Sequence, residues 1–299
     1  MTVPATKRIL DAMLEARLEA RVWQWYRDTC SIVADGMPVA RFASVLSLAS
    51  RYAPRQQLAP TTTEVAGAAQ VLAGWTPESW TVLEAMRVGL MLARSDLGQP
   101  TAVEAFDECF RYADQGETCA LYRVLAHLPD GARFVWRAGE GCRTNIVPVF
   151  EAIACDNPFP MQHFDDLAWR QLVIKAVFIG APLWRVYGLD DRLSPELARM
   201  ALDLADERRS AGRVVQHELW LCLGEHGGDR AIDALEAELA SSHAIGRRAA
   251  VLALARAGQR VRLERLLADG SDGELCAAAR TALDGACDQR AFGRLEERS

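Results

Sequence analysis

Lysine is almost absent from this sequence of 299 residues. Of its 34 basic residues, only Lys7 and Lys175 are lysines, and the formal net charge is −6. An acidic balance argues against nucleic acid as the main partner, because proteins that bind it usually carry a basic surface. We therefore expect no nucleic-acid partner.

Long apolar runs are missing as well. No stretch of ~18 consecutive apolar residues occurs, so the sequence predicts no transmembrane helix. The N-terminal segment has no apolar core behind its basic residues and predicts no signal peptide. The eight cysteines include no CxxC pair, and we expect reduced thiols rather than disulfides. These absences predict a cytoplasmic protein with at most peripheral membrane contact.

The motifs of common enzyme classes are also missing. The sequence has no dinucleotide fingerprint, phosphate-binding loop, nucleophile elbow or EF-hand loop. His217-Glu218-Leu219-Trp220 begins like a zinc-hydrolase motif, but position 221 is leucine where the second histidine is needed. We predict no cofactor and no metal. The residues favour a non-enzymatic role and leave an enzyme open.

What the sequence does contain is helical periodicity along its whole length. Apolar residues recur three and four positions apart, and no segment alternates as a strand does. We predict an all-α protein, a multi-helical, solenoid-like bundle. The predicted helices include 7–29, one that starts at Thr76-Pro77-Glu78, 161–179, and 213–225.

The character of the sequence changes after His226-Gly227-Gly228, the predicted domain boundary. Short helices rich in alanine, leucine and arginine follow, and RRAAVLALARAG and LCAAARTALDGA resemble the second helices of two hairpins. We predict a helical domain over 1–226 and degenerate HEAT-like repeats over 227–299, packed together as one continuous unit. The charged tail after Arg290 is expected to fray.

The stretch from Gly139 to Arg192 concentrates turn signals, charges and an apolar helix. Asn157-Pro158 ends one helix, because a residue before proline is pushed out of the α region. The second half of the helix at 161–179 is apolar all round, which predicts that it is buried on every side. Lys175 lies inside this apolar run, and a buried ammonium is unfavourable unless it is paired or neutralised.

Polar residues of this stretch form a candidate ligand site. Arg143 has the guanidinium geometry that clamps a carboxylate or phosphate. Lys175 either forms a structural ion pair with Asp165 or Glu151, or lines a pocket as the buried charge. The full candidate set is Arg143, Asn145, Glu151, Asn157, Asp165, Trp169, Lys175, Asp191 and Arg192.

Residues upstream of this stretch have simpler interpretations. Glu117, Tyr122 and Arg123 could face the candidate site, but a solvated helix face is the default expectation. His127 lies on an apolar stretch and is interpreted as a hydrogen-bonded core histidine rather than a ligand. Turn and helix-cap chemistry accounts for Asp191 as well as a site does.

Several short motifs in a fixed order resemble those of the EboA family. They are Arg143-Thr144-Asn145, Phe150-Glu151-Ala152, Asn157-Pro158-Phe159-Pro160, Ala168-Trp169, Lys175–Gly180, Gly188–Arg192, Glu207-Arg208, Ala211-Gly212-Arg213 and Glu218-Leu219-Trp220. The resemblance covers roughly positions 40–225. Arg170 and His217 depart from it, because the family often has asparagine after the tryptophan and proline before Glu-Leu-Trp.

The resemblance implies a helical bacterial protein that moves or processes a secondary metabolite. It also implies partners from the same gene cluster, including a prenyltransferase-like membrane protein, and it carries over no catalytic residue. Three functions stay open. They are binding of a small polar or anionic metabolite, a helical-repeat enzyme that uses Lys175 with nearby carboxylates, and a pure scaffold for the membrane protein.

Overall fold

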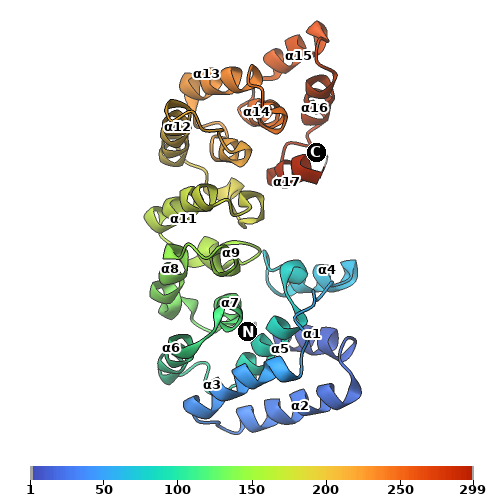
Figure 1. The fold of residues 1–299 in the computed structure, drawn as a ribbon, viewed down its shortest axis with the longest axis vertical. Helices are drawn as coiled ribbons and strands as arrows, with labels where there is room; N and C mark the ends of the chain where they lie inside the picture. The colour runs from blue at the N-terminus through green and yellow to red at the C-terminus, as the bar shows by residue number, and fades with distance from the viewer. Residues whose placement is uncertain (1–2, 298–299) are drawn as a thin grey trace. The chain divides into compact units, whose positions relative to one another are not determined.

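The computed structural model describes residues 3–297, and its first compact unit, Met1–Trp169, is built around one buried helix. Helix α5 (Val82–Leu92) is buried along its whole length, including Glu84 and Arg87. It begins at a capping box, in which the Thr81 hydroxyl accepts a hydrogen bond from the Glu84 N–H and the Glu84 carboxylate accepts one from the Thr81 N–H. Helices α1, α2 and α7 contact α5 (Figure 1).

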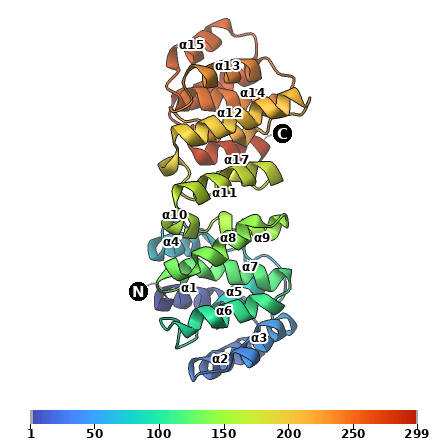
Figure 2. The same cartoon turned by 90° about the vertical axis from the view of Figure 1, so that its left-hand side faces the viewer.

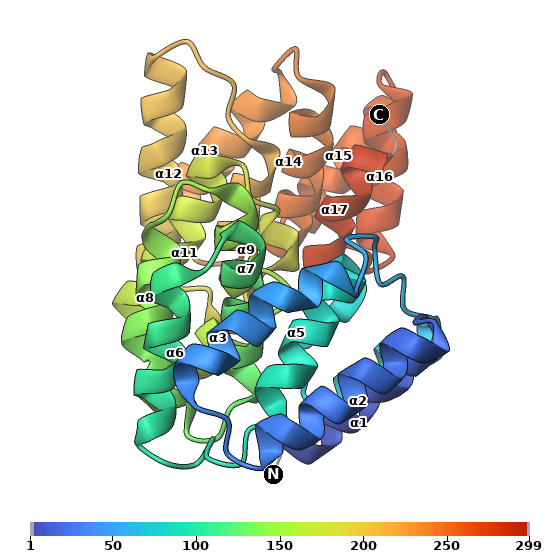
Figure 3. The ribbon, with the colours of Figure 1, turned by 60° about the horizontal axis from the view of Figure 1, so that its bottom comes forward.

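The other helices of this unit enclose α5 or extend from its neighbours. They are α1 (Val3–Glu15), α2 (Ala20–Ala34), α3 (Val39–Leu48), α4 (Thr62–Val71), α6 (Thr101–Tyr112), α7 (Gln115–Val124), α8 (Val135–Arg143), α9 (Val147–Ala154) and α10 (Phe159–His163). Helix α3 packs on α6, α6 on α7, and α7 on α9 (Figure 3). The all-α fold is confirmed: the described residues form helices and turns, with a single isolated bridge between Gln57 and Thr81.

One predicted helix and one predicted helix start are wrong in this unit. The helix expected at 7–29 is broken after Glu15, where Arg17 turns back to pair with Glu64 and to donate to the carbonyl of Leu58. Thr76-Pro77-Glu78 opens only a 3₁₀ turn, η2 (Pro77–Ser79). The α-helix starts later, because the capping box lies at Thr81.

The second compact unit, Arg170–Ser299, is centred on α14 (Ala244–Arg256). Its other helices are α12 (Pro195–Ser210), α13 (Gly228–Leu239), α15 (Arg260–Asp269), α16 (Gly273–Leu283) and α17 (Gln289–Glu297). Helices α13, α15, α16 and α17 all contact α14 (Figure 2). The pairs α13/α14 and α15/α16 form the expected hairpins, and their HEAT-like character stays a prediction.

Helix α11 (Asp166–Ile179) contains the boundary between the units, after Trp169. The predicted burial of its apolar half on every side is wrong at Phe178, whose exposed fraction is 63%. None of the helices in residues 3–297 has the length and apolar composition needed to cross a bilayer.

The predicted helix at 213–225 is also wrong. A 3₁₀ segment, η7 (His217–Cys222), takes its place. Residues 219–223 are all fully buried, and the Glu218 carboxylate accepts the Leu183 N–H at 2.5 Å. An amphipathic α-helix leaves one face in solvent, so burial of consecutive side chains overrides the helical pattern here.

The expected fraying after Arg290 is wrong for residues 291–297, because α17 packs into the second unit, and positions 298–299 lie outside the described residues. Phe292 is fully buried, and Gln289 Nε2 donates to the carbonyls of Leu183, Trp184 and Val186 at 3.4, 2.8 and 2.6 Å. Gly293 permits this docking, since a Cβ there would lie 2.6 Å from the Trp184 ring.

Two glycines of α8 provide a matched test of packing in the first unit. A Cβ at Gly141 would lie 2.7 Å from the Tyr122 ring, whereas a Cβ at Gly139 meets nothing within 4 Å. Alanine favours a helix over glycine equally at both positions. We predict that the free energy of unfolding of Gly141→Ala lies roughly 1–3 kcal/mol below that of Gly139→Ala, measured by urea denaturation. Equal stabilities would contradict this packing.

Candidate functional site

Two buried ion pairs join α5 to α7. Arg123 Nε lies 3.2 Å from Glu84 Oε1, and Arg87 Nη2 lies 3.3 Å from Glu117 Oε1. All four side chains are almost completely withdrawn from solvent. The expectation of a solvated face for Glu117, Tyr122 and Arg123 is therefore wrong, because α7 packs against both α5 and α9.

Arg123 begins a chain of hydrogen bonds that ends at a carboxylate. Its Nη1 donates to Ser79 Oγ at 3.3 Å, and Ser79 Oγ donates to Asp156 Oδ2 at 3.2 Å. Thr76 Oγ1 donates to the other oxygen, Asp156 Oδ1, at 3.4 Å. The loops before α5 and after α9 are thus linked through Asp156.

Three aromatic rings form the opposite side of this network. Trp75 meets His127 edge-on with their centroids 4.6 Å apart, and Arg123 Cζ lies 5.5 Å from the centroid of Trp80. His127 is buried, and its Nδ1 lies 3.2 Å from Thr6 Oγ1, as expected for a core histidine. Complete burial lowers the pKa of His127 to about 3, so the ring is neutral at pH 7.

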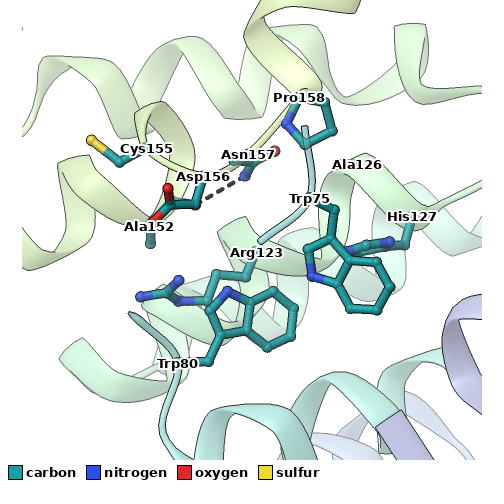
Figure 4. Close-up of a pocket in the computed structure, with 10 residues that line it drawn as sticks. All are labelled: Trp75, Trp80, Arg123, Ala126, His127, Ala152, Cys155, Asp156, Asn157 and Pro158. Carbon is teal, nitrogen blue, oxygen red and sulfur yellow. Dashed lines mark hydrogen bonds between the residues drawn. The ribbon is translucent and has the colours of Figure 1, made fainter. Parts of the chain in front are cut away.

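The indole N–H of Trp75 has no partner. Trp75 is 1% exposed, and no group among the described residues accepts a hydrogen bond from its Nε1. Figure 4 shows this nitrogen turned toward the space between Trp80, Arg123 and Asn157. Most buried donors are paired in folded proteins, and among the side chains that line this space Trp75 Nε1 is an exception.

Together these groups enclose a narrow pocket, called here the Trp75–Asp156 pocket. Its lining residues are Trp75, Trp80, Arg123, Ala126, His127, Ala152, Cys155, Asp156, Asn157 and Pro158 (Figure 4). The hollow measures about 180 Å³ including its open mouth, but it is too narrow to hold a whole water molecule. A ligand therefore enters only if part of the wall moves.

Asn157 belongs to this wall, and its amide is committed to the backbone. Nδ2 donates to the carbonyls of Tyr122 and Ala152 at 3.3 and 2.9 Å, and Oδ1 accepts the Phe159 N–H at 3.0 Å. An asparagine amide has two N–H donors, and both are used here. Asn157 therefore fastens the loop after α9 and has no donor left for a ligand.

The other predicted site residues of the first unit lie away from this pocket. Arg143 is exposed and forms an ion pair with Glu140, one turn earlier on α8. The Asp165 carboxylate accepts the Ala168 N–H at 2.8 Å and so caps the first turn of α11. Asn145 is exposed, Glu151 is half-buried and Trp169 is buried.

The remaining predicted residues lie in the second unit. Lys175 is half-buried on α11, Asp191 is exposed, and Arg192 is half-buried in the 3₁₀ turn η6 (Asp190–Arg192). Asp190, the first residue of this turn, pairs with Arg256 at 2.5 Å. This pair ties the charged turn to α14.

A second hollow lies between α3, α6 and α7, and about 230 Å³ of it has room for water, whereas the Trp75–Asp156 pocket has none. Ser44 and Ser47 line it, and each donates its hydroxyl hydrogen to a carbonyl of its own helix. Glu108 and Glu117 contribute carboxylates. This groove therefore presents mainly hydrogen-bond acceptors, whereas the Trp75–Asp156 pocket presents donors.

Sequence reasoning missed Trp75, Trp80 and Asp156, and it assigned Arg123 to a solvated face by default. Two signals were available, namely the pair of tryptophans on either side of Thr76-Pro77, and an aspartate directly before Asn157-Pro158. Among residues 3–297, no group of three or more histidine, cysteine, aspartate or glutamate side chains is arranged to hold a metal ion.

A family model described as metabolite traffic protein EboA matches residues 6–224. The matched region includes the whole Trp75–Asp156 pocket and all the residues predicted from the sequence, and it ends before α13. No curated protein and no solved structure matches the chain.

The buried, neutral His127 makes stability depend on pH. An unfolded histidine titrates near ~6.5, so between pH ~6.5 and ~3 the unfolded chain binds a proton that the folded protein excludes. The free energy of unfolding should therefore fall as the pH falls through this window. We predict that His127→Leu lowers the slope of that free energy against pH by up to ~1.4 kcal/mol per unit, measured by urea denaturation from pH 4 to 7. An unchanged slope would contradict the assigned burial.

Proposed function

The chain belongs to the EboA family of metabolite traffic proteins, and we propose that it acts in this traffic by binding a small polar or anionic metabolite. The proposed binding place is the Trp75–Asp156 pocket of the first unit. Arg123 is its cation, and Trp75 and Trp80 are its aromatic walls.

The observation that carries this choice is the unpartnered indole N–H of Trp75. A buried donor without an acceptor costs about 1–3 kcal/mol, and a ligand that supplies the acceptor removes this cost. Arg123 adds further donors, because a guanidinium has five N–H groups and Glu84 and Ser79 accept only two of them. The pocket is therefore suited to a ligand with hydrogen-bond acceptors.

We place the anion clamp on Arg123 rather than on Arg143. The Arg143 side chain is 73% exposed and already paired with Glu140, so solvent screens its charge. Arg123 is 9% exposed and is held by Glu84 and Ser79. A cation that is desolvated and fixed in advance binds an anion with a smaller loss of freedom.

The wider setting of this proposal comes from the family. The metabolite passes in the cytoplasm between this protein and partner proteins of secondary metabolism, among them a prenyltransferase-like membrane protein. The hairpins α13/α14 and α15/α16 lie beyond the matched region and are the proposed contact for protein partners. An enzyme built on Lys175 would need a lysine in dry surroundings, and Lys175 is half-buried.

Native mass spectrometry of protein purified gently from its own host tests the proposal. Trp75→Phe keeps an aromatic ring and removes the N–H, and Trp136→Phe, at an exposed position of α8, is the matched control. We expect a reproducible excess mass on the wild type and on Trp136→Phe. Trp75→Phe should bind the metabolite about tenfold more weakly, because it loses one hydrogen bond of the kind made to a charged group.

Two results would overturn the proposal. Equal occupancy of the ligand on both variants would move the binding place out of the Trp75–Asp156 pocket. A wild type without excess mass, purified together with other proteins, would favour the scaffold. Matching unfolding midpoints for the two variants ensure that loss of binding is not loss of fold.

A further inference from the structure

We propose that the groove between α3, α6 and α7 is a second binding site, and that it takes a small organic ammonium ion with an apolar body. This inference goes beyond the proposed function, because it concerns another place in the first unit and a ligand of the opposite charge. The site is called here the Glu108–Glu117 groove, after the two carboxylates that line it.

The groove is open, unlike the Trp75–Asp156 pocket. About 230 Å³ of it has room for water, and an apolar cavity of ~150 Å³ already holds benzene. The room arises on α3, which packs beside α6 and lines the groove with small side chains three and four residues apart (Figure 3). They are Ala40, Ala43, Ser44 and Ser47. A molecule of one ring with a short arm therefore matches this room with the wall in place.

One arginine ties two walls of the groove together. Arg87 of α5 donates from Nε to the Leu46 carbonyl of α3 at 3.0 Å, and from Nη2 to Glu117 Oε1 of α7 at 3.3 Å. Leu46 and Glu117 both line the groove. Gly116 leaves space for the guanidinium, since a Cβ there would lie 3.3 Å from Arg87 Nη1. The groove is thus built in advance, which lowers the loss of freedom when a ligand binds.

Glu117 is the buried carboxylate of the groove. Its side chain is 9% exposed, and it accepts hydrogen bonds from Arg87 and from the Asp114 N–H at 3.3 and 3.0 Å. The bond to Arg87 is longer than the about 2.7–2.9 Å that is typical of a charged pair. A carboxylate has about four acceptor positions, so these two bonds leave capacity for a ligand. An ammonium group has three N–H donors and no acceptor, and it matches this capacity.

Glu108 adds a second, more exposed carboxylate from α6. It is half-buried and forms an ion pair with Arg111, one turn later, at 2.8 Å. The Arg111 side chain is 67% exposed, so solvent screens its charge and the pair contributes little. A cationic ligand in the groove therefore meets a carboxylate whose own partner is weakly held.

The remaining lining consists of further acceptors and apolar surface. Ser44 and Ser47 donate their hydroxyl hydrogens to carbonyls of their own helix at 3.1 and 3.3 Å, which leaves their oxygens as acceptors. Leu46 and Leu121 are buried and supply apolar surface. Tyr112 is 72% exposed and adds an aromatic ring, whose face attracts cations. An ammonium ion with an apolar body suits both kinds of surface.

The Cys109 thiol lies in the negative field of the two carboxylates. Burial raises its pKa to about 11, Arg94 opposes the rise, and Glu108 and Glu117 add to it. The thiol is therefore uncharged at pH 7, and both carboxylates act on the same point of the lining. Such a field attracts a cationic ligand and repels an anionic one.

Phenethylamine, which is protonated at pH 7, is the probe for this site. Phenethyl alcohol has the same size and no charge, and it serves as the neutral analogue. Both dissociation constants are measured on the full chain at pH 7 by ligand-observed NMR titration. Glu117 is left unchanged in the test, because its loss would leave Arg87 buried without its ion-pair partner.

Two test variants each have a matched control on a neighbouring position. Glu108→Gln removes a groove carboxylate, and Glu104→Gln removes an exposed one that lies one turn earlier on α6 and does not line the groove. Ser47→Leu fills the groove. Ser50→Leu is its control, since both serines are exposed and bond only a backbone carbonyl, and Ser50 does not line the groove.

We expect the wild type to bind phenethylamine on the order of tenfold more tightly than phenethyl alcohol, because only the amine forms charged hydrogen bonds. Glu108→Gln should weaken binding of the amine roughly threefold, as expected for a partly exposed ion pair. Ser47→Leu should abolish detectable binding, because the leucine side chain occupies the room that the ring needs. Both controls should bind like the wild type.

Three results would overturn the inference. Equal affinity for phenethylamine and phenethyl alcohol would make the groove an apolar hollow without preference for a cation. Equal binding by each test variant and its control would place the amine outside the groove. Displacement of the amine by an equal concentration of Mg²⁺ would make this a site for divalent cations. Matching unfolding midpoints for each variant and its control ensure that a loss of binding is not a loss of fold.

Discussion

The two buried ion pairs between α5 and α7 are the constraint on which the first unit depends. Glu84 and Arg87 on α5 face Arg123 and Glu117 on α7, and the reversed order of the charges sets the helices antiparallel. Removing one partner of a buried pair leaves an uncompensated charge, at a typical cost of 3–5 kcal/mol. The pairs therefore fix the register of α7 against α5, and this register places Arg123 beside Trp80 and Ser79.

Much of the helical architecture can be predicted from the sequence, because helix ends depend on local chemistry. The Ser194 side chain caps α12 through the Leu197 N–H, three residues away, and His127 is a core histidine, as expected. The burial of Arg123 could not be predicted from local sequence, because its partner Glu84 is 39 positions away. Periodicity reports which face of a helix is polar, but it cannot report that a neighbouring helix carries the complementary charges.

The Trp75–Asp156 pocket could not be predicted from the sequence for the same reason. It is assembled from residues 75–80, 123–127 and 152–158, which lie far apart along the chain. Asn157 was predicted as a ligand-binding residue and does line the pocket, but its amide is bonded to the backbone. The residue before it, Asp156, carries the charge. In the second unit, Gln289 and Phe292 dock α17 on residues 183–186 of the family region. The helices beyond residue 224 thus share a core with part of the region that the family model matches.

The central claim is that the Trp75 N–H recognises a hydrogen-bond acceptor of the bound metabolite, and indole ¹H–¹⁵N NMR tests it most directly. The chain has eight tryptophans, and comparison with Trp75→Phe assigns the Trp75 signal. Between protein purified gently from its own host and the same protein stripped of small molecules, the account predicts that the Trp75 indole proton lies further downfield in the first, while the exposed Trp136 signal stays in place. A Trp75 signal at the same position in both samples would contradict the account.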